Sequence, residues 1–430
     1  MKRFIAGLFV VVMGLGFVVA QAARSQEPEA SRKTKISNTS LAGSLPFSGS
    51  LPLDGGGLGW GCAATCHHLH TPDTFEQENA ATAQDKPTWQ VAAEKQALPL
   101  IEKKKLNALV IGVIDRLGKK HFFTLGEKPG SLEKLDENTI FEIGSITKTM
   151  TSFLLADAIQ RLEAKLDDPV QSLLPEGMTV PKRGNKDITL EDLATHTSGF
   201  PRLQVGLSSK LMLDSKLQAN PYSAYDVEDL KKSLAQTKPK VSDKPKVEYS
   251  NYGAGLLGFA LCQKYKKSYA ELLQERLFTP LGMKDSFVVV PDAEKARFID
   301  GFTPEGKPSQ HWDFRDASAG AGAVRSTASD MLLYVEAAMG RTKKLQPAFE
   351  LMEAPQYEMG PKMQIGLAWI IIEMNKKRAW WHNGGTGGFA SFAGFSKNPG
   401  VGVIVLSNRF NAAGEVDKIG MKVLESLMSE

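Results

Sequence analysis

Two short apolar runs, separated by a polar turn, open the globular part of the chain. Residues 108–115 (ALVIGVID) are rich in β-branched side chains, and residues 121–125 (HFFTL) follow the Gly-containing segment RLGKK. Runs of this length and composition on either side of a turn are typical of paired β-strands. The pattern therefore predicts two strands at the start of the globular region.

A longer apolar pattern follows the turn-rich segment 126–139. From about Ser145 to Leu166, apolar side chains recur at the spacing that places them on one face of an α-helix. These positions are Met150, Phe153, Leu154, Ala158 and Leu162. The spacing predicts a helix over this stretch.

The middle of the chain, residues 186–345, is predicted to be mainly helical. Thr189 and Asp192 form the pattern of a capping box, and Thr327 and Asp330 mark the start of another helix in the same way. Both pairs stand directly before or within apolar helical runs.

Near the C-terminus the period changes to that of strands. Four short aromatic and β-branched runs are separated by Lys, Gly, Asn and Pro, and a helical run, EVDKIGMKVLESLM, closes the chain. Strands at both ends with helices between them predict an α+β fold, in which one antiparallel sheet flanked by helices is assembled from both chain ends. The helical middle would form a second lobe, with the site in the cleft between the lobes.

The N-terminus has the pattern of a secretory signal. Lys2 and Arg3 precede an apolar run that ends in Ala-Gln-Ala at 20–22, so we expect a signal peptide over residues 1–22 that is cleaved after Ala22. The alternative is an uncleaved anchor, because the run approaches the roughly 20 residues that span a bilayer. Either way the chain is expected to be exported, to the periplasm or beyond.

Residues 23–95 show little periodicity and are predicted to be a flexible linker before a globular domain over 96–430. The linker contains two thiols and three imidazoles within ten residues, which could form a disulfide or bind a metal ion: Cys62, Cys66, His67, His68 and His70. Because they lie in a polar, Gly-rich stretch, we favour a linker with incidental metal affinity, and their role stays open. Cys262 lies in an apolar run and is expected to be buried.

The composition bounds the kind of partner. The chain has 430 residues, 42% of them hydrophobic, and a net charge of only +4. These values indicate a sizeable core and give no reason to expect binding to nucleic acid or, after signal cleavage, to a membrane surface. We expect a monomer.

Ser145 and Lys148 lie three positions apart at a predicted helix start, so their side chains share one face. The free N–H groups and the positive dipole end of a helix stabilise an oxyanion and disfavour an ammonium group. Lys148 could therefore act as a base towards Ser145. A capping serine beside a solvated lysine is the alternative, and Ser131 and Lys134 show the same spacing in a turn-rich stretch.

A second candidate motif is Tyr249-Ser250-Asn251, the only Tyr-x-Asn in the chain, which stands just before an apolar helix. Two side chains at this spacing can point into one cleft. The phenol can relay a proton, and the carboxamide offers both a donor and an acceptor.

A third motif is His382-Asn383-Gly384-Gly385, which closes one predicted strand before the next begins at Phe389. Glycines allow a substrate to approach the backbone closely, as an oxyanion N–H or an edge-strand pairing requires. Taken singly, the histidine is more often structural and the glycine pair a turn.

In this order, Ser-x-x-Lys, Tyr-x-Asn and Lys/His-x-Gly resemble the motifs of the serine β-lactamase and penicillin-binding protein superfamily, in its class C β-lactamase-related branch. The segments 188–204, 277–286 and 321–331 are similar to that branch as well, so the resemblance covers about residues 100–430. It implies a β-lactamase/transpeptidase-like fold and a serine hydrolase that acts through an acyl-enzyme on β-lactam or D-Ala-D-Ala-type amides. The substrate would be a small molecule or a peptidoglycan peptide, with no metal or organic cofactor.

The resemblance also implies a role for each site residue. Ser145 would be the nucleophile, and Lys148 and Tyr249 would share the proton transfers, with the identity of the neutral base left open. The N–H groups of Ser145 and Gly385 would form the oxyanion hole. The substrate would be held by Asn251, His382, Gly384 and Gln204.

One position departs from the β-lactamases, which have a lysine where this chain has His382. A lysine attracts the carboxylate of a β-lactam or of a peptide, whereas histidine, with an unperturbed pKa of ~6.5, is mostly neutral near pH 7. Two alternatives therefore stay open: an esterase with an acyl pocket lined by Trp380, Trp381 and Phe389, and a non-hydrolytic sensor of β-lactams or muropeptides. The chain has neither a Gly-x-Ser-x-Gly nor a His-Glu-x-x-His motif.

Overall fold

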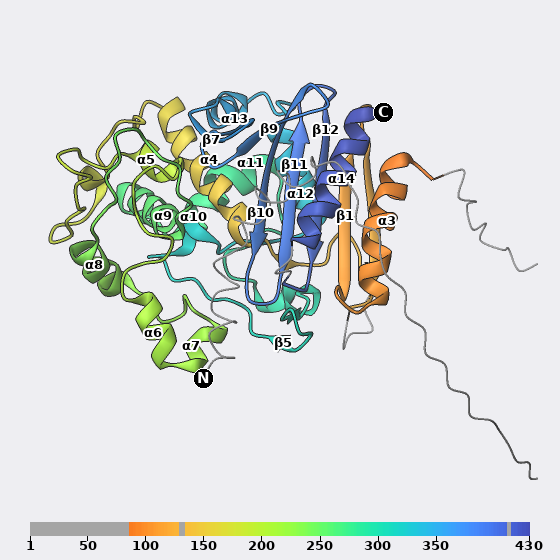
Figure 1. The fold of residues 1–430 in the computed structure, drawn as a ribbon, viewed down its shortest axis with the longest axis horizontal. Coiled ribbons are helices and arrows are strands. Elements are labelled where there is room, and N and C mark those ends of the chain that lie inside the picture. Colours follow the sequence, from red (N-terminus) through yellow and green to blue (C-terminus); the bar gives the residue numbers. More distant parts are fainter. Residues whose placement is uncertain (1–85, 129–133, 411–413) are drawn as a thin grey trace, which may run out of the picture. The chain divides into compact units, whose positions relative to one another are not determined.

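The computed structural model describes residues 86–128, 134–410 and 414–430, whose elements are labelled in Figure 1. The predicted signal peptide, the Cys/His-containing segment and Ser131 lie outside the described residues. Among the helices that are described, none has the length and apolar character needed to cross a membrane.

An antiparallel sheet forms the centre of the described part of the chain. Its eight strands follow the order β2-β1-β12-β11-β10-β9-β8-β7. Strands from opposite ends of the chain are neighbours, because β1 (Ala108–Ile114) pairs with β12 (Val401–Ser407). The other strands are β2 (Lys120–Gly126), β7 (Tyr357–Gly360), β8 (Met363–Ile365), β9 (Ile370–Met374), β10 (Lys377–Gly385) and β11 (Ala390–Ser396). The predicted α+β fold, with one sheet assembled from both ends, is confirmed.

Helices cover both faces of this sheet, which explains why β1 is apolar at every position. Leu109, Ile111 and Val113 pack into one core, and Val110 and Ile114 pack into the other, since successive strand residues point to opposite faces. The first core lies under α3 (Thr88–Glu102) and α14 (Glu415–Ser429), which run beside β1 in Figure 1. The second lies under α4 (Thr147–Gln160), α12 (Ala328–Ala338) and α13 (Gln346–Glu353).

The predicted helical middle is largely confirmed, with one change. It contains α5 (Leu190–Ala194), α6 (Leu207–Leu213), α7 (Ser215–Ala219), α8 (Val227–Gln236), α9 (Asn251–Tyr265), α10 (Tyr269–Leu273) and α11 (Thr279–Leu281). Two-residue strands also occur there: β4 (Gly301–Phe302) pairs with β5 (Pro308–Ser309), and β6 (Arg325–Ser326) pairs with β3 (Phe141–Glu142), which precedes α4 in the chain. Helix α12, which the sequence placed in the helical lobe, instead packs against β12 and β1 of the sheet.

The two predicted helix caps differ in the structure. Thr189 and Asp192 form a reciprocal capping box at the start of α5. Thr327 accepts the N–H of Asp330 at the start of α12. The carboxylate of Asp330, however, accepts the N–H of Asp285 at 2.7 Å and the hydroxyl of Ser286 at 2.8 Å. Asp330 therefore ties two segments together rather than closing a capping box.

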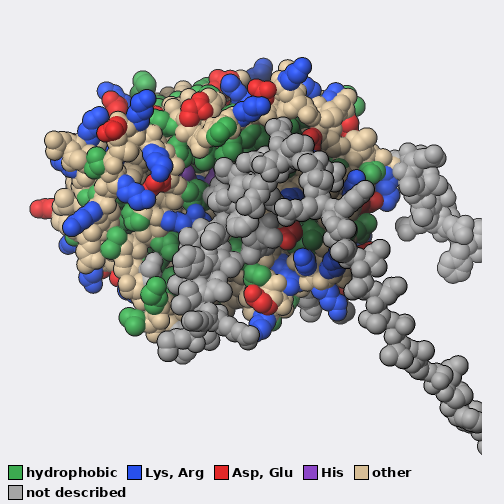
Figure 2. All heavy atoms as spheres, viewed as in Figure 1, with side chains coloured by type: hydrophobic (Ala, Val, Ile, Leu, Met, Phe, Trp, Pro, Cys, Tyr) green, Lys and Arg blue, Asp and Glu red, His purple; other side chains and the backbone are tan. Residues whose placement is uncertain are grey.

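The globular region begins earlier than residue 96. Helix α3 starts at Thr88, and Trp89 and Ala93 are buried, so residues 88–95 belong to the packed region and not to the linker. Cys262 is buried in α9, as expected. Over the described part of the face drawn in Figure 2, acidic and basic side chains are interspersed.

The helix that carries Lys148 is shorter than predicted. Helix α4 follows a 3₁₀ turn, Gly144–Ile146, and ends at Gln160 instead of Leu166. Leu162 adopts φ +61° and is 93% exposed. The N–H groups of Leu162 and Glu163 bond back to the last turn, which is the Schellman arrangement that ends a helix at a left-handed residue. The helix predicted from the apolar spacing therefore extends six residues past the observed end of α4.

Leu162 should be a site where glycine stabilises the protein. A left-handed conformation costs a non-glycine residue about 1 kcal/mol or more, so Leu162→Gly should raise the free energy of unfolding by about that amount relative to Leu117→Gly. Leu117 is a matched control, because it is 94% exposed and does not have a positive φ. Urea unfolding monitored by circular dichroism measures the difference. Equal or lower stability of Leu162→Gly would contradict the backbone assignment.

Candidate active site

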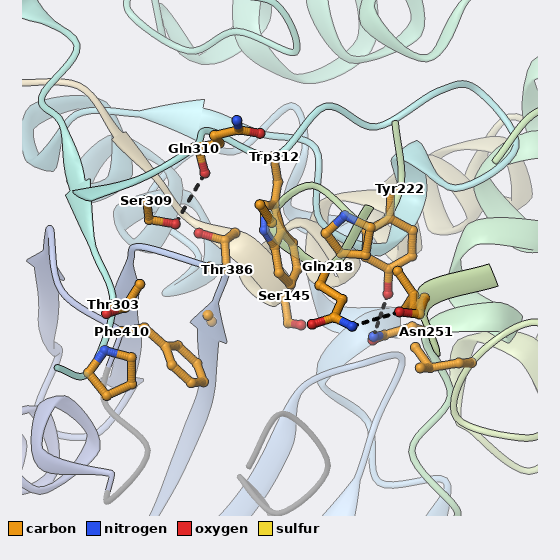
Figure 3. Close-up of a pocket in the computed structure, with 18 of the residues that line it drawn as sticks. Ser145, Gln218, Tyr222, Asn251, Thr303, Ser309, Gln310, Trp312, Thr386 and Phe410 are labelled. Atoms are coloured by element: carbon orange, nitrogen blue, oxygen red, sulfur yellow. Dashed lines mark hydrogen bonds between the residues drawn. The ribbon is translucent and has the colours of Figure 1, made fainter. Parts of the chain in front are cut away.

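A cavity of about 660 Å³ lies where the end of β10 meets the helical middle. Residues 383–387 form one wall, and Arg202, Tyr222, Tyr249 and Asn251 belong to another. The ladder between β10 and β9 ends at Trp381↔Ile370, so the β9-facing edge of the last residues of β10 is not paired with β9. Figure 3 shows Ser145 in the middle of the pocket, with Tyr222 and Asn251 on one side and Thr303 and Phe410 on the other.

The turn that carries Ser145 is pressed against the backbone of β10. Gly144 has φ +50°, and a Cβ placed on it would lie 2.6 Å from the backbone nitrogen of Gly385. A Cβ on Gly384 would lie 2.0 Å from the carbonyl oxygen of Ile143. Only glycine fits at these two positions. The close approach brings Ser145 and Gly385, the predicted oxyanion pair, to the same part of the cavity.

Lys148 is buried directly beside Ser145, with 1% of its surface exposed. Its Nζ and the Oγ of Ser145 are hydrogen-bonded at 2.9 Å, and Nζ also donates to the carbonyl of Ala321 at 2.6 Å. Burial holds the pKa of Lys148 well below its usual value, and the positive charge of Arg202 lowers this pKa further. An amine that has lost its proton can accept the Ser145 hydroxyl proton.

Tyr249 is the second polar neighbour of Ser145. Its ring centroid lies 4.9 Å from Lys148 Nζ, 4.9 Å from Arg202 Cζ and 4.6 Å from the ring centroid of His196. Exclusion of water from the phenol raises the pKa of Tyr249 to about 12, although Arg202 and the Ser145 hydroxyl act in the opposite direction. The phenol therefore keeps its proton near neutral pH.

Asn251 begins α9 and faces the cavity. The hydroxyl of Ser250 caps this helix by accepting the N–H of Gly253 at 2.9 Å. Asn251 Nδ2 donates to the Tyr222 hydroxyl at 3.0 Å, while Oδ1 has no hydrogen-bond partner among the described residues. The amide is thus held in place with one acceptor left for a substrate N–H.

His382 does not line the cavity, although the sequence analysis placed it at the substrate. Its side chain is 1% exposed, and its Nδ1 bonds to the carbonyl of Asn383. The reason is the alternation of side chains along β10, which places Asn383 on the pocket wall instead. Burial, with the charge of Lys148, lowers the pKa of His382 to about 3, so the ring is neutral near pH 7.

Gln204 and the predicted aromatic lining also lie elsewhere. Gln204 is 1% exposed, is absent from the cavity wall, and its amide atoms have no hydrogen-bond partner among the described residues. Trp380, Trp381 and Phe389 are buried in the two cores and do not line the cavity. Apolar lining comes instead from Leu203, Leu207, Leu211, Pro221, Trp312 and Phe410.

Several residues of the site escaped the sequence analysis. Arg202 stands on the cavity wall two positions before Gln204. Asp417 also lines the cavity, accepts Asn383 Nδ2 at 2.7 Å, and has its pKa raised to about 7 by burial. Neither lies in a motif whose spacing indicates a role, so the sequence offered no signal for them. Within the described ranges, no cluster of three or more His, Cys, Asp or Glu is placed to hold a metal ion.

Comparison of the chain with known proteins agrees with this geometry. The profile of the family described as Beta-lactamase matches residues 97–427. A "Beta-lactamase" of Escherichia coli (strain K12) is 29% identical over 347 residues, which cover 72% of this chain and 86% of that protein. The "D-alanyl-D-alanine-carboxypeptidase/endopeptidase AmpH" of the same organism is 27% identical over 318 residues, 70% of this chain and 79% of that protein.

Solved structures show the same fold. The "class C beta lactamase from Rhodobacter sphaeroides" has a TM-score of 0.67 at 24% identity, over 79% of this chain and 99% of that one. The "Beta-Lactamase/D-Alanine Carboxypeptidase from Pseudomonas syringae" has a TM-score of 0.67 at 21% identity, over 78% of this chain and 98% of that one.

Because the turn of Ser145 is in contact with β10, a methyl group added at Gly144 should strongly slow the reaction of Ser145. Gly144→Ala should push the backbone of Gly385 away and slow the covalent labelling of Ser145 by a fluorophosphonate probe by about 100-fold or more, as loss of an oxyanion donor does. Gly206→Ala is the control, because Gly206 has φ +88° but nothing within 4 Å of its Cβ position. Gly206→Ala should lose stability through a similar backbone strain, but its Ser145 should be labelled at the wild-type rate. Intact-mass time courses measure both, and equal labelling rates would contradict the proposed contact.

Proposed function

This chain belongs to the beta-lactamase family, and we propose that it is a serine hydrolase that opens β-lactam or D-Ala-D-Ala-type amides through an acyl-enzyme on Ser145. The observation that carries the proposal is the 2.9 Å hydrogen bond between the buried Lys148 Nζ and Ser145 Oγ. The relatives named as β-lactamase and D-alanyl-D-alanine-carboxypeptidase support the substrate class.

The electrostatics favour Lys148 over Tyr249 as the base, because the pKa of the lysine is lowered and that of the phenol is raised to about 12. As Ser145 Oγ bonds to the substrate carbonyl carbon, its proton passes to Lys148 Nζ. The negative charge that forms on the carbonyl oxygen is stabilised by the N–H groups of Ser145 and Gly385.

Collapse of this intermediate breaks the bond to the leaving nitrogen. Tyr249 donates its proton to that nitrogen and is reprotonated by the ammonium of Lys148, which restores the neutral amine. Water then attacks the acyl carbon as one of its protons passes to Lys148, and the Lys148 ammonium gives that proton to the Ser145 oxygen as the acyl bond breaks. The two residues thus return to their starting protonation states after each turnover.

The substrate is held between Asn251 and the end of β10. The unpartnered Oδ1 of Asn251 accepts an N–H of the acyl group. On the other side, the edge of β10 beyond Trp381 is free of β9, so an extended peptide or the amide of a β-lactam side chain can bond to its backbone.

An esterase of the same family is the second candidate, because the neutral His382 gives the β10 wall no cation for a substrate carboxylate. Turnover of a chromogenic cephalosporin, a D-Ala-D-Ala peptide and p-nitrophenyl butyrate separates the candidates. Turnover of the ester alone would overturn the ranking, and a stable adduct without turnover would indicate a sensor.

We also infer from the N-terminal pattern that the chain is exported by a signal peptide cleaved after Ala22. An exported enzyme would meet peptidoglycan peptides and β-lactams outside the cytoplasm. N-terminal sequencing of the protein secreted by its host measures the cleavage site.

Ser145 should be the residue that carries the acyl group. Ser145→Ala should give no adduct with benzylpenicillin or a cephalosporin by intact-mass spectrometry and should keep the thermal unfolding temperature of the wild type. Ser131→Ala changes the other Ser-x-x-Lys of the chain and should leave acylation unchanged. Adduct formation at the wild-type rate in Ser145→Ala would contradict the mechanism.

The pH dependence should report Lys148. Because the neutral amine is the active form, kcat/KM should rise with pH through the pKa of Lys148, at lower pH than an ordinary lysine titrates. Arg202→Gln removes a positive charge that lowers this pKa, so it should move the acid limb to higher pH. Lys232→Gln removes an exposed charge on α8 and should leave the limb in place. A limb that does not move in Arg202→Gln would argue against Lys148 as the base.

A further inference from the structure

The described wall of the cavity carries charges of opposite sign at its two ends. Arg202 is the only lysine or arginine among the described side chains that line it, and Glu305 and Asp417 are the acidic ones. The backbone carbonyl of Arg202 accepts the N–H of Asn251 at 2.9 Å, which fixes Arg202 on the Asn251 side.

The acidic Glu305 belongs to the other side. Glu305 Oε2 accepts the hydroxyl of Thr303 at 2.8 Å, and Asp417 accepts the side-chain amide of Asn383. Figure 3 shows Thr303 and Asn251 on opposite sides of Ser145. A substrate in the cavity is therefore exposed to the positive charge of Arg202 on one side and to the carboxylate of Glu305 on the other.

The guanidinium of Arg202 is available to a ligand. Its Cζ lies 4.9 Å from the ring centroid of Tyr249, which holds it over one face of the phenol. Within the described residues it forms no ion pair. The two acidic residues of the cavity wall bond instead to Thr303, in the case of Glu305, and to Asn383, in the case of Asp417. An arginine has five N–H donors in a planar fork and binds a carboxylate through two of them at once.

Arg202 also occupies the part of the site where a substrate contact was expected from Gln204. Gln204 is turned away from the cavity, and Arg202 lines it in its place, next to Asn251. Asn251 offers its free Oδ1 to the acyl group under the function proposed above. The neighbouring cation then faces the acyl group and not the leaving group.

We propose that Arg202 binds a carboxylate carried by the acyl group of the substrate, so that the enzyme selects acyl donors with an anionic substituent near the scissile carbonyl. The proposal rests on the acyl-transfer function assigned to this site. The carboxylate of Glu305, on the Thr303 side of the cavity, disfavours the reversed orientation, in which the anion would lie near it. The positions of the charged side chains thus determine which acyl substituent is preferred and how the substrate is oriented in the cavity.

Carbenicillin and benzylpenicillin provide the test. Both carry the ring carboxylate, and they differ by one further carboxylate on the acyl side chain. Arg202→Gln should lower the ratio of acylation kcat/KM, carbenicillin over benzylpenicillin, by about tenfold or more, the loss expected for one charge-assisted hydrogen bond. Arg202→Lys keeps the charge without the fork and should lie between wild type and Arg202→Gln. Lys232→Gln should leave the ratio at its wild-type value.

The ratio separates recognition from the effect of Arg202 on Lys148, because a change in the pKa of the base slows both penicillins equally. Equal slowing, with an unchanged ratio, would overturn the proposal. Acylation by neither penicillin in the wild type would contradict the proposed function. The role of Arg202 would then be decided by the same comparison on p-nitrophenyl hemisuccinate and p-nitrophenyl butyrate, whose acyl groups differ by a carboxylate.

Discussion

The chemistry of this protein depends on a lysine amine kept away from water. An ammonium group in such a place costs several kilocalories per mole unless it is paired. Lys148 is 1% exposed and has no carboxylate partner among the described residues; it bonds to Ser145 Oγ and the Ala321 carbonyl instead. The neutral amine therefore has the lower free energy in this place, and the positive charge of Arg202 lowers the pKa of Lys148 further. The fold therefore makes a base by exclusion of water, with Lys148 as the hydrogen-bond partner of the Ser145 hydroxyl.

The sheet creates this environment because strands from both chain ends pair in it and bring the end of β10 against the turn that carries Ser145. Pairing of β1 with β12 places β11 and β10 in register, and the end of β10 then meets the turn of Gly144. The contact leaves no room for a side chain on Gly144 or Gly384 and sets Gly385 beside Ser145. Residues more than 200 positions apart in sequence thus supply the nucleophile and the oxyanion wall. The same closure buries His382 as a neutral ring, so Arg202 is left as the cation that the described residues present to the substrate.

Local signals in the sequence were sufficient for the strands and for the grouping of the site motifs. The run that became β1 was recognisable because both of its faces are buried, and the Thr189 cap because both partners lie within one turn. Features that depend on tertiary register were not recognisable. Leu162 continues the apolar spacing of α4 in the sequence, but its left-handed backbone lies beyond the end of the helix. Likewise, nothing in the order of residues 202–204 says that the arginine faces the cavity and Gln204 the interior, because the path of the loop decides it.

The protonation state of Lys148 decides whether this residue can act as the base for Ser145. The protein labelled with ¹³C at the lysine Cε can be titrated by NMR, with the Lys148 signal assigned by its loss in Lys148→Met. This signal should titrate at distinctly lower pH than those of the exposed lysines, because burial and Arg202 lower the pKa of Lys148. A Lys148 signal that titrates together with the exposed lysines would contradict it, since an ammonium that persists to high pH could not take the proton of Ser145.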